Sequence, residues 1–269
     1  MQTYTAQQLL SPDNTNVLEE VILVLAHSFI EDPHTKWLFF NHTRSQYIAA
    51  LPSYFRVVVK VALLSDASVT VVRDDPLTPP KSSSIQTQKQ DLAGARIKAV
   101  GIIIPPHGNK TFDSPLTGVR ASALTLPFTC GLVTTWRLLV HFVPALKAMQ
   151  DRIYPPTDLS SSSQEHFFWH IMFLATHPDA QGQGLGTKLL REYQKVVTQV
   201  VETSDKQEGE AASLYLEASS VSSKRLYSRV GFRDRDTMVY GTLGEGDDVR
   251  VDEEGRVIGG RQFGMTWTP

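Results

Sequence analysis

The segment that decides the fold is HPDAQGQGLGTKLL, residues 177–190, in which Gly182, Gly184 and Gly186 occupy alternate positions. Glycine disfavours helical structure by roughly 1 kcal/mol per residue relative to alanine, so three glycines are unfavourable where a helix is expected to begin. Two explanations are open. Either the segment makes a tight turn that suits glycine, or a ligand approaches its backbone closely.

The residues on either side of this segment predict a strand before it and a helix after it. The continuous apolar run FFWHIMFLATHP, residues 167–178, is typical of a central strand that is buried on both faces. The helix is indicated by apolar residues at helical spacing, namely Leu189, Tyr193, Val196 and Val200. A strand, a helix and a strand are then expected at 213–219, 222–230 and 232–241. This order is typical of an α/β fold.

Upstream of this region the pattern is mostly helical. A first helix is expected to begin at Asp13 or Asn14, whose side chains can accept N–H bonds at its start. A second helix is expected over residues 43–64 despite Pro52. The remaining expected elements are strands at 67–75, 96–106 and 261–269 and a helix at 133–152.

The composition limits the possible function classes. With a net charge of −2 and an isoelectric point of about 6.4, the chain lacks the basic excess of an electrostatic nucleic-acid binder. The single cysteine, Cys130, allows no intrachain disulfide and argues against a thiolate zinc site, so no metal is expected. The first residues lack a signal-peptide pattern, and the apolar run 21–30 is too short to span a bilayer. We therefore expect a cytoplasmic protein without a membrane partner.

The position of the glycines, between a buried strand and a helix, is suited to binding phosphate. The start of a helix presents unpaired N–H groups and the positive end of the dipole, and glycine lets a phosphate come close to them. A turn without any ligand is the alternative. The order Gly186, Thr187, Lys188 does not fit a P-loop, and the third glycine comes one residue too early for a dinucleotide fingerprint.

Two motifs resemble those of the GNAT N-acetyltransferase superfamily. QGQGLG resembles the motif Q/R-x-x-G-x-G/A, with Gln181, Gly184 and Gly186 at the matching positions. About 40 residues later, LYSRVGF resembles L-Y-x-x-x-G-F, with matches at Leu226, Tyr227, Gly231 and Phe232. This specific resemblance covers roughly residues 166–233. Upstream, the segments IEDP, KWLF and VGIIIPP are similar to fungal and bacterial members near the puromycin-acetyltransferase-like branch.

The resemblance implies a fold and a donor substrate. The expected fold is one α/β domain over residues 1–269, with a mixed, mostly antiparallel twisted sheet of about seven strands flanked by helices. It includes a helical insertion at 106–165, between strands three and four, and a flexible acidic loop or hairpin at 242–260. The implied donor is acetyl-CoA, with its pyrophosphate on the glycine loop and its pantetheine arm along residues 172–176 like an added strand.

The resemblance also assigns residues to the donor. The implied contacts are Leu174, Ala175, Thr176, Gln181, Gly182, Gln183, Gly184, Leu185, Gly186 and Thr187. A backbone N–H near Ala175 or Thr176 would polarise the thioester carbonyl. Many family members carry an asparagine in the turn before the helix expected here at 222–230. This chain has serines there, so Ser220 and Ser223 are the expected contacts.

Candidate catalytic residues follow from the same resemblance. Tyr227 matches the tyrosine beside the CoA sulfur and is expected to protonate the departing thiolate, with a packing role as the alternative. The amine must lose a proton, and Glu217, His170 and His177 are candidate bases. Burial could raise the pKa of Glu217 to a useful value, but Glu217 could equally be structural, and His170 a core residue. Water could also carry the proton away.

Glu31 and Asp32 are candidate contacts for a cationic acceptor, because family acceptor sites often use the loop after the first helix. A solvated helix end is the alternative. The expected function is acetyl-CoA-dependent N-acetyl transfer to a primary amine of a small molecule, by direct attack in a ternary complex. A non-catalytic acyl-CoA-binding or regulatory module and a nucleotide-binding protein are the alternatives. Either a monomer or a homodimer is compatible with the sequence.

Overall fold

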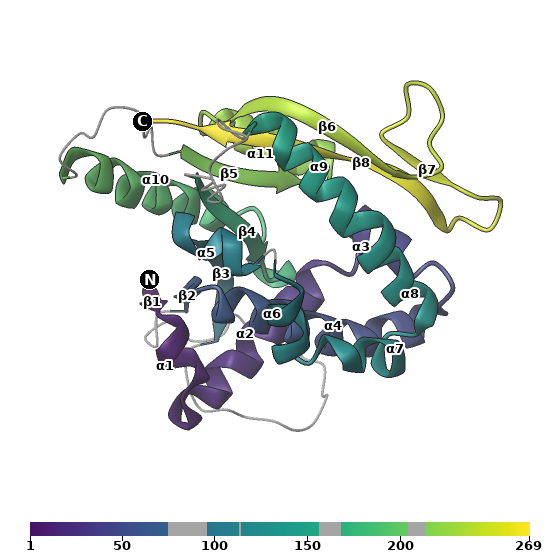
Figure 1. Cartoon of the computed structure of the whole chain (residues 1–269), viewed down its shortest axis with the longest axis horizontal. Coiled ribbons are helices and arrows are strands. Elements are labelled where there is room, and N and C mark those ends of the chain that lie inside the picture. The colour runs from purple at the N-terminus through teal and green to yellow at the C-terminus, as the bar shows by residue number, and fades with distance from the viewer. Residues whose placement is uncertain (75–95, 113, 156–167, 204–212) are drawn as a thin grey trace.

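The computed structural model describes residues 1–74, 96–112, 114–155, 168–203 and 213–269. Its strands form one open sheet in the order β1-β2-β3-β4-β5-β8-β6, with β7 paired to β8 (Figure 1). The strands are β1 (Gln2–Tyr4), β2 (Ser68–Arg73), β3 (Ile97–Ile104), β4 (Phe168–Thr176), β5 (Ser213–Ala218), β6 (Arg233–Gly241), β7 (Val249–Val251) and β8 (Val257–Trp267). Only β4 and β5 pair in parallel within these residues. The predicted mostly antiparallel α/β sheet is confirmed, with eight strands described.

Helices cover both faces of the sheet. They are α1 (Ala6–Leu10), α2 (Thr15–Ser28), α3 (Pro33–Leu38), α4 (Arg44–Leu64), α5 (Pro106–Phe112), α6 (Pro115–Arg120), α7 (Leu126–Thr129), α8 (Leu132–Trp136), α9 (Val143–Ile153), α10 (Leu185–Thr203) and α11 (Val221–Arg229). Side chains alternate across β3, so that Ile102 and Ile104 join the core cluster under α2 and α4, while Ile103 joins the cluster under α10 and α11. This alternation explains why the strand reads as a continuous apolar run.

The first helices begin differently from one another. Thr43 caps α4, accepting from the N–H of Gln46, and the helix continues through Pro52 as predicted. The expected side-chain cap on α2 is wrong. Asn14 stands at the N-cap position, but its amide donates to the Gln8 carbonyl at 2.9 Å, and a 3-10 turn over Pro12–Asn14 leads into the helix instead.

Helix α4 is long and apolar enough to cross a membrane by length and composition. Half of that apolar stretch is buried inside the protein, which is also typical of a core helix.

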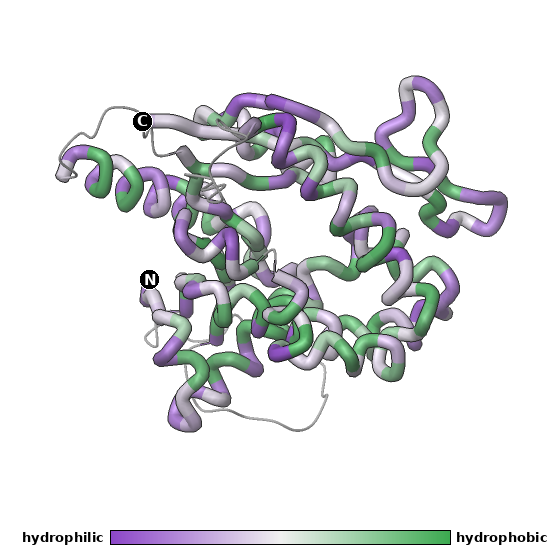
Figure 2. The backbone as a smooth tube through the Cα atoms, viewed as in Figure 1, coloured by the Kyte–Doolittle hydropathy of each residue, from purple (hydrophilic) through white to green (hydrophobic). Residues whose placement is uncertain are grey.

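The insertion between β3 and β4 is helical, as predicted. It contains α5 to α9, and a π-helical turn, Arg137–Phe142, joins α8 to α9 without a break. The continuous run therefore covers the helix expected at 133–152. Figure 2 shows hydrophobic stretches along these helices. The end of the insertion, residues 156–165, lies outside the described residues.

The acidic segment 242–260, for which the sequence predicted a loop or hairpin, contains a hairpin. β7 pairs with the beginning of β8 to form a hairpin that projects from the sheet (Figure 1). β8 starts at Val257, four residues before the strand expected at 261–269. Gly255 lies in the turn between β7 and β8 and has a φ of 76°. Glycine adopts this left-handed conformation easily, so it allows the chain to reverse direction in the hairpin.

Candidate functional site

Strands β4 and β5 separate halfway along β4. The parallel register runs from Phe168 and Ser213 to Ile171 and Leu216 and then stops. Residues 173–176 continue to pair with β3 on the other side, after a bulge at Met172, but within the described residues no strand pairs with their β5 side. This separation leaves an open strand edge in the middle of the sheet, and an extended polyamide can add to such an edge.

The direction of the backbone groups on this edge follows from one hydrogen bond. The N–H of His177 donates to the Lys98 carbonyl at 2.8 Å, which places it on the β3 side. Because N–H groups alternate along a strand, Ala175 also directs its N–H toward β3, and Leu174 and Thr176 direct theirs toward the open edge. Of the two positions expected for the thioester donor, Ala175 therefore directs its N–H away from the open edge, and Thr176 directs its N–H toward that edge. Thr176 or Leu174 has the required direction.

The carbonyl of Thr176 supports this assignment. Ser28 Oγ donates to it at 3.0 Å, and Gln181 Nε2 donates to it at 3.3 Å. Neither donor belongs to β3, so this carbonyl faces away from β3. Gln181 thus ties the end of β4 to the glycine loop.

The geometry of the glycine loop, residues 181–187, agrees both with a tight turn that needs glycine and with close approach of a ligand to the backbone. Gly182 and Gly184 have φ values of 78° and 75°, in the left-handed region, where glycine is favoured. A Cβ atom at either position would meet nothing within 4 Å, so the space beside the loop is open. Gly186 differs, because a Cβ atom there would make ordinary contacts with Leu226 and Leu174 at 3.6 and 3.7 Å. Helix α10 starts directly after the turn, and its first backbone bond runs from Lys188 N–H to the Gly184 carbonyl at 3.0 Å.

One cavity of about 1650 Å³ joins the loop, the open edge and the insertion. Its lining includes nearly all of the residues expected to contact the donor, namely Leu174, Ala175, Thr176, Gln181, Gly182, Gly184, Leu185, Gly186, Thr187, Ser220, Ser223 and Tyr227. Gln183 is the expected contact that is not among the lining residues. Sites for a single small ligand usually measure about 300 to 1,000 Å³, so this cavity has room for two molecules at once.

Ser220 and Ser223 form a capping box at the start of α11. The Ser220 hydroxyl accepts from the N–H of Ser223 at 3.1 Å, and the Ser223 hydroxyl accepts from the N–H of Ser220 at 3.1 Å. The two hydroxyls also lie 2.9 Å apart. Both residues line the cavity, but their hydroxyls already stabilise the helix.

Tyr227 lies on α11, is 8% exposed and lines the cavity. Within the described part of the chain no residue hydrogen-bonds its hydroxyl. Burial raises the pKa of Tyr227, and the nearby carboxylates of Asp32 and Glu217 raise it further. The phenol therefore stays protonated at neutral pH, in the form that can donate a proton.

Glu217 and His170 form a buried pair, although the sequence offered them as separate candidates. His170 Nε2 lies 2.9 Å from Glu217 Oε2, and Gln150 Nε2 donates to the other carboxylate oxygen at 3.3 Å. All three residues line the cavity. His170 is thus neither isolated in the core nor free of partners. Its imidazole can exchange a proton with the carboxylate, which is the arrangement of a proton acceptor with an orienting group.

His177 is located differently from the other candidate bases. Its Nδ1 accepts from the N–H of Asp179 at 3.3 Å, which caps the turn after β4, and its ring meets His27 edge-on at 5.6 Å. It does not line the cavity. The structure therefore gives His177 a place in the turn and offers no support for it as a base.

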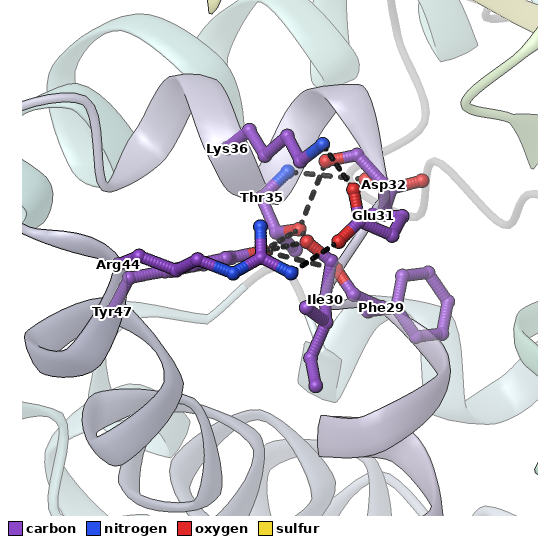
Figure 3. Close-up of polar contacts among 8 residues, drawn as sticks. All are labelled: Phe29, Ile30, Glu31, Asp32, Thr35, Lys36, Arg44 and Tyr47. Atoms are coloured by element: carbon purple, nitrogen blue, oxygen red, sulfur yellow. Dashed lines mark hydrogen bonds and ion pairs between the residues drawn. The ribbon is translucent and has the colours of Figure 1, made fainter. Parts of the chain in front are cut away.

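Glu31 and Asp32 have different surroundings at the end of α2 (Figure 3). The Glu31 side chain is 64% exposed, and its ion pairs with Lys36 and Arg44 lower its pKa. For Glu31 this arrangement agrees with a solvated helix end, which was the alternative to a role in binding the acceptor. Glu31 nevertheless also lines the cavity.

Asp32 faces the interior of the cavity. It caps α3 by accepting from the N–H of Thr35 at 3.0 Å, and Ser219 Oγ donates to its other oxygen. Burial raises the pKa of Asp32 to about 6, against the opposite effect of the hydrogen bond from Ser219. The turn itself is held by Tyr47, whose hydroxyl donates to the carbonyls of Phe29 and Ile30 at 3.0 Å (Figure 3).

Two arginines of the cavity were not expected from the sequence. Arg191 on α10 and Arg229 on α11 both line it, and both are exposed. Neither makes an ion pair with the residues that the structure describes, while Arg229 Nε donates to the Arg225 carbonyl at 3.3 Å. A signal was present, since Arg191 follows the glycine loop by little more than one helical turn, where a cation can face bound phosphate.

A family model identifies this region of the chain. Residues 155–234, less than a third of the sequence, match the acetyltransferase (GNAT) domain. The match covers the glycine loop and the open edge of β4, and it supports acetyl transfer by this region in general terms. The resemblance to the puromycin-acetyltransferase-like branch stays a prediction.

Solved structures that resemble the chain at low identity and with TM-scores below 0.5 include acetyltransferases. One is described as histone acetyltransferase HPA2 and related acetyltransferase from Corynebacterium glutamicum, with 17% identity, coverage of 100% of this chain and 97% of that chain, and a TM-score of 0.45. Another is arylalkylamine N-acetyltransferase 2 from Aedes aegypti, with 14% identity, coverage of 99% and 98%, and a TM-score of 0.47. No curated protein matches the sequence.

Proposed function

We propose that the chain is an acetyl-CoA-dependent N-acetyltransferase that acts on the primary amine of a small molecule while both substrates are bound. The observation that carries this proposal is that the glycine loop and the open edge of β4 line the same cavity. The first can receive a pyrophosphate, and the second can pair with a polyamide arm. Acetyl-CoA has both groups.

The residues at the loop fit the phosphates of this donor. Backbone N–H groups of residues 182–187 precede the first helical hydrogen bond of α10, where the helix dipole also favours an anion. Arg191 and Arg229 supply positive charge beside them. Bound in this way, acetyl-CoA supplies an acetyl group activated as a thioester.

The other polar groups of the cavity can accept and donate the protons that move during acetyl transfer. The Glu217–His170 pair can accept the proton that the amine loses, and the outward N–H of Thr176 or Leu174 can stabilise negative charge on the acetyl oxygen. The protonated phenol of Tyr227 can donate a proton to the sulfur. Asp32 can attract the amine in its ammonium form before it is deprotonated.

The test is release of CoA thiol from acetyl-CoA in the presence of a panel of primary amines, with the acetylated product identified by mass spectrometry. The proposal predicts amine-dependent release and an N-acetylated product. Binding of acetyl-CoA without turnover on any amine would instead support the non-catalytic CoA-binding module. Absence of any binding would contradict both.

A further inference from the structure

Two carboxylates mark the polar end of the acceptor side of the cavity. Ser219, two residues after Glu217 in the chain, donates its hydroxyl to Asp32. The charges of Asp32 and Glu217 both raise the pKa of Tyr227, so both carboxylates lie within electrostatic range of its hydroxyl. An ammonium group that is to lose its proton and be acetylated is therefore expected between them.

An apolar stripe leads from this polar end to the surface along the helical run that ends in α9. At its inner end Gln150 is 5% exposed and donates to Glu217 at 3.3 Å. Leu146, Val143 and Leu139 follow at intervals of three or four residues, the spacing of one helix face, and all three line the cavity. Leu146 is half-buried, while Val143 and Leu139 are 46% and 49% exposed. The apolar stripe thus connects a buried polar group with solvent.

Other parts of the insertion extend this apolar lining. Phe112 on α5 meets the His170 ring edge-on with centroids 5.9 Å apart, which places it at the polar end. Val119 on α6 and Leu124 in the following turn are 49% and 68% exposed, and both line the cavity. Single exposed apolar side chains are common on protein surfaces. Several of them on the rim of one cavity indicate instead that an apolar ligand covers them.

The charges near the apolar stripe do not suit a second ammonium group. Among the described residues the cavity is lined by the carboxylates of Glu31, Asp32 and Glu217. Glu31 is already engaged in two ion pairs. Lys147, on the same helix as the apolar stripe, also lines the cavity and is itself a cation. A second ammonium group beside the stripe would therefore lose water without gaining a carboxylate.

We propose that the acceptor is a primary amine with a long apolar tail, with its amino group between Asp32 and Glu217 and its tail along the apolar stripe. The inference rests on the proposed function, because it names the acceptor class of that reaction. At about 1.5 Å per residue, the helix carries the stripe roughly 15 Å from Gln150 to Leu139. An extended hydrocarbon chain with bonds of about 1.5 Å needs about 12 carbon atoms for this length.

The first test is a series of unbranched primary amines from butylamine to tetradecylamine, each assayed below the concentration at which it forms micelles. We expect kcat/KM to rise about twofold for each added methylene, because each one is partly removed from water, and to level off at about 12 carbon atoms. Diaminohexane, with an amino group at each end, should be acetylated at least tenfold less efficiently than hexylamine, since its second ammonium group would lie beside the stripe.

Val143→Asn tests the apolar stripe against a closely matched control. Val143 and Val140 belong to the same helical run and are 46% and 44% exposed, but of the two only Val143 lines the cavity. Val143→Asn should lower the ratio of kcat/KM for dodecylamine to kcat/KM for butylamine about tenfold, and Val140→Asn should keep this ratio. Leu139→Asn, at the outer end of the stripe, is a second variant that should lower it. Thermal melting and CoA affinity verify the fold of each variant.

Calorimetric titration of the same amines separates this inference from the proposed function. If no amine is acetylated, but affinity rises with tail length and Val143→Asn weakens the binding of dodecylamine, the binding site stands and the proposed function fails. If amines are acetylated without any dependence on tail length, the proposed function stands and the inference fails. An unchanged ratio in both stripe variants would also overturn the inference, as would a preference for a long acyl group on the CoA donor in place of a long amine.

Discussion

Ile171 on β4 and Leu216 on β5 are the last pair in register before these two strands separate. The next residues along β4 present an open edge to the cavity, and Glu217, which follows Leu216, lines the same cavity. The divergence thus creates space for an extended donor and places a carboxylate beside it. The space for the donor and the position of the carboxylate therefore both depend on the point at which the pairing of β4 with β5 ends.

Gly184→Ala tests the glycine loop. An alanine in the left-handed region costs about 1 kcal/mol, so the melting temperature should fall slightly, and the new Cβ atom would occupy the open space beside the loop. We expect CoA affinity to fall at least tenfold in calorimetry. Gly255→Ala, with φ 76° and equally open surroundings in the hairpin, is the matched control. Equal CoA affinity in the two variants would remove the loop from the donor site.

Tyr227→Phe tests the proton donor. General acids contribute about 10² to 10⁴ in rate, so kcat should fall roughly 100-fold while the dissociation constant of CoA stays within about twofold. Tyr193→Phe removes another buried hydroxyl, on α10 outside the cavity lining, and should leave both values unchanged. A Tyr227→Phe enzyme with normal kcat would leave Tyr227 a packing role only.

Glu217→Gln tests the buried pair. The amide preserves the shape of the side chain but cannot accept the proton that His170 would pass on, so kcat should fall by about 10² or more near neutral pH. The rate should recover partly as the pH rises and the amine loses its proton in solution. Glu202→Gln, on the exposed end of α10, should keep the wild-type pH profile. If both variants have wild-type rates, water or another group accepts the proton.

Asp32→Asn tests the effect of the buried carboxyl on stability. Its pKa rises on folding from 3.8 to about 6, so the folded state binds a proton more readily than the unfolded state. Stability from this group is therefore highest below about pH 4, falls between about pH 4 and pH 6, and stays low above pH 6. A two-unit shift corresponds to about 3 kcal/mol in full, and we expect on the order of 2 because Asp32 is half-buried and solvent screens part of the effect.

Asp32→Asn should remove this dependence, because asparagine can still cap α3 and does not titrate. Denaturant unfolding at pH 4 and pH 7 measures the difference. The variant should gain stability relative to the wild type at pH 7 and change little at pH 4. A gain of the same size at both pH values would show that the carboxylate is not destabilised by burial.

The sequence predicted the elements around the site because their signals are local. The apolar run of β4, the helical spacing of α10 and the glycines between them each depend on neighbouring residues. Gly182 and Gly184 are needed by the turn itself, so their presence could be interpreted before the fold was known. The helix expected at 133–152 likewise followed from a local pattern, and the structure has a continuous helical run there.

The features that escaped prediction depend on contacts between distant segments. The direction of the Ala175 N–H follows from the register between β3 and β4, which the sequence of β4 alone does not contain. The pairing of His170 with Glu217 requires two strands to be neighbours. Asn14 makes no cap, and its side-chain amide instead donates to the carbonyl of Gln8 in the preceding helix.

Amide hydrogen exchange with and without saturating CoA tests the central claim most directly, because it reports on individual backbone groups of the proposed donor site. We predict at least tenfold slower exchange at Leu174 and Thr176, which face the open edge, and at residues 182–187, which precede the first bond of α10. Ala175, whose N–H faces β3, should change much less. Slower exchange elsewhere with no change at these positions would contradict the placement of the donor between β4 and the glycine loop.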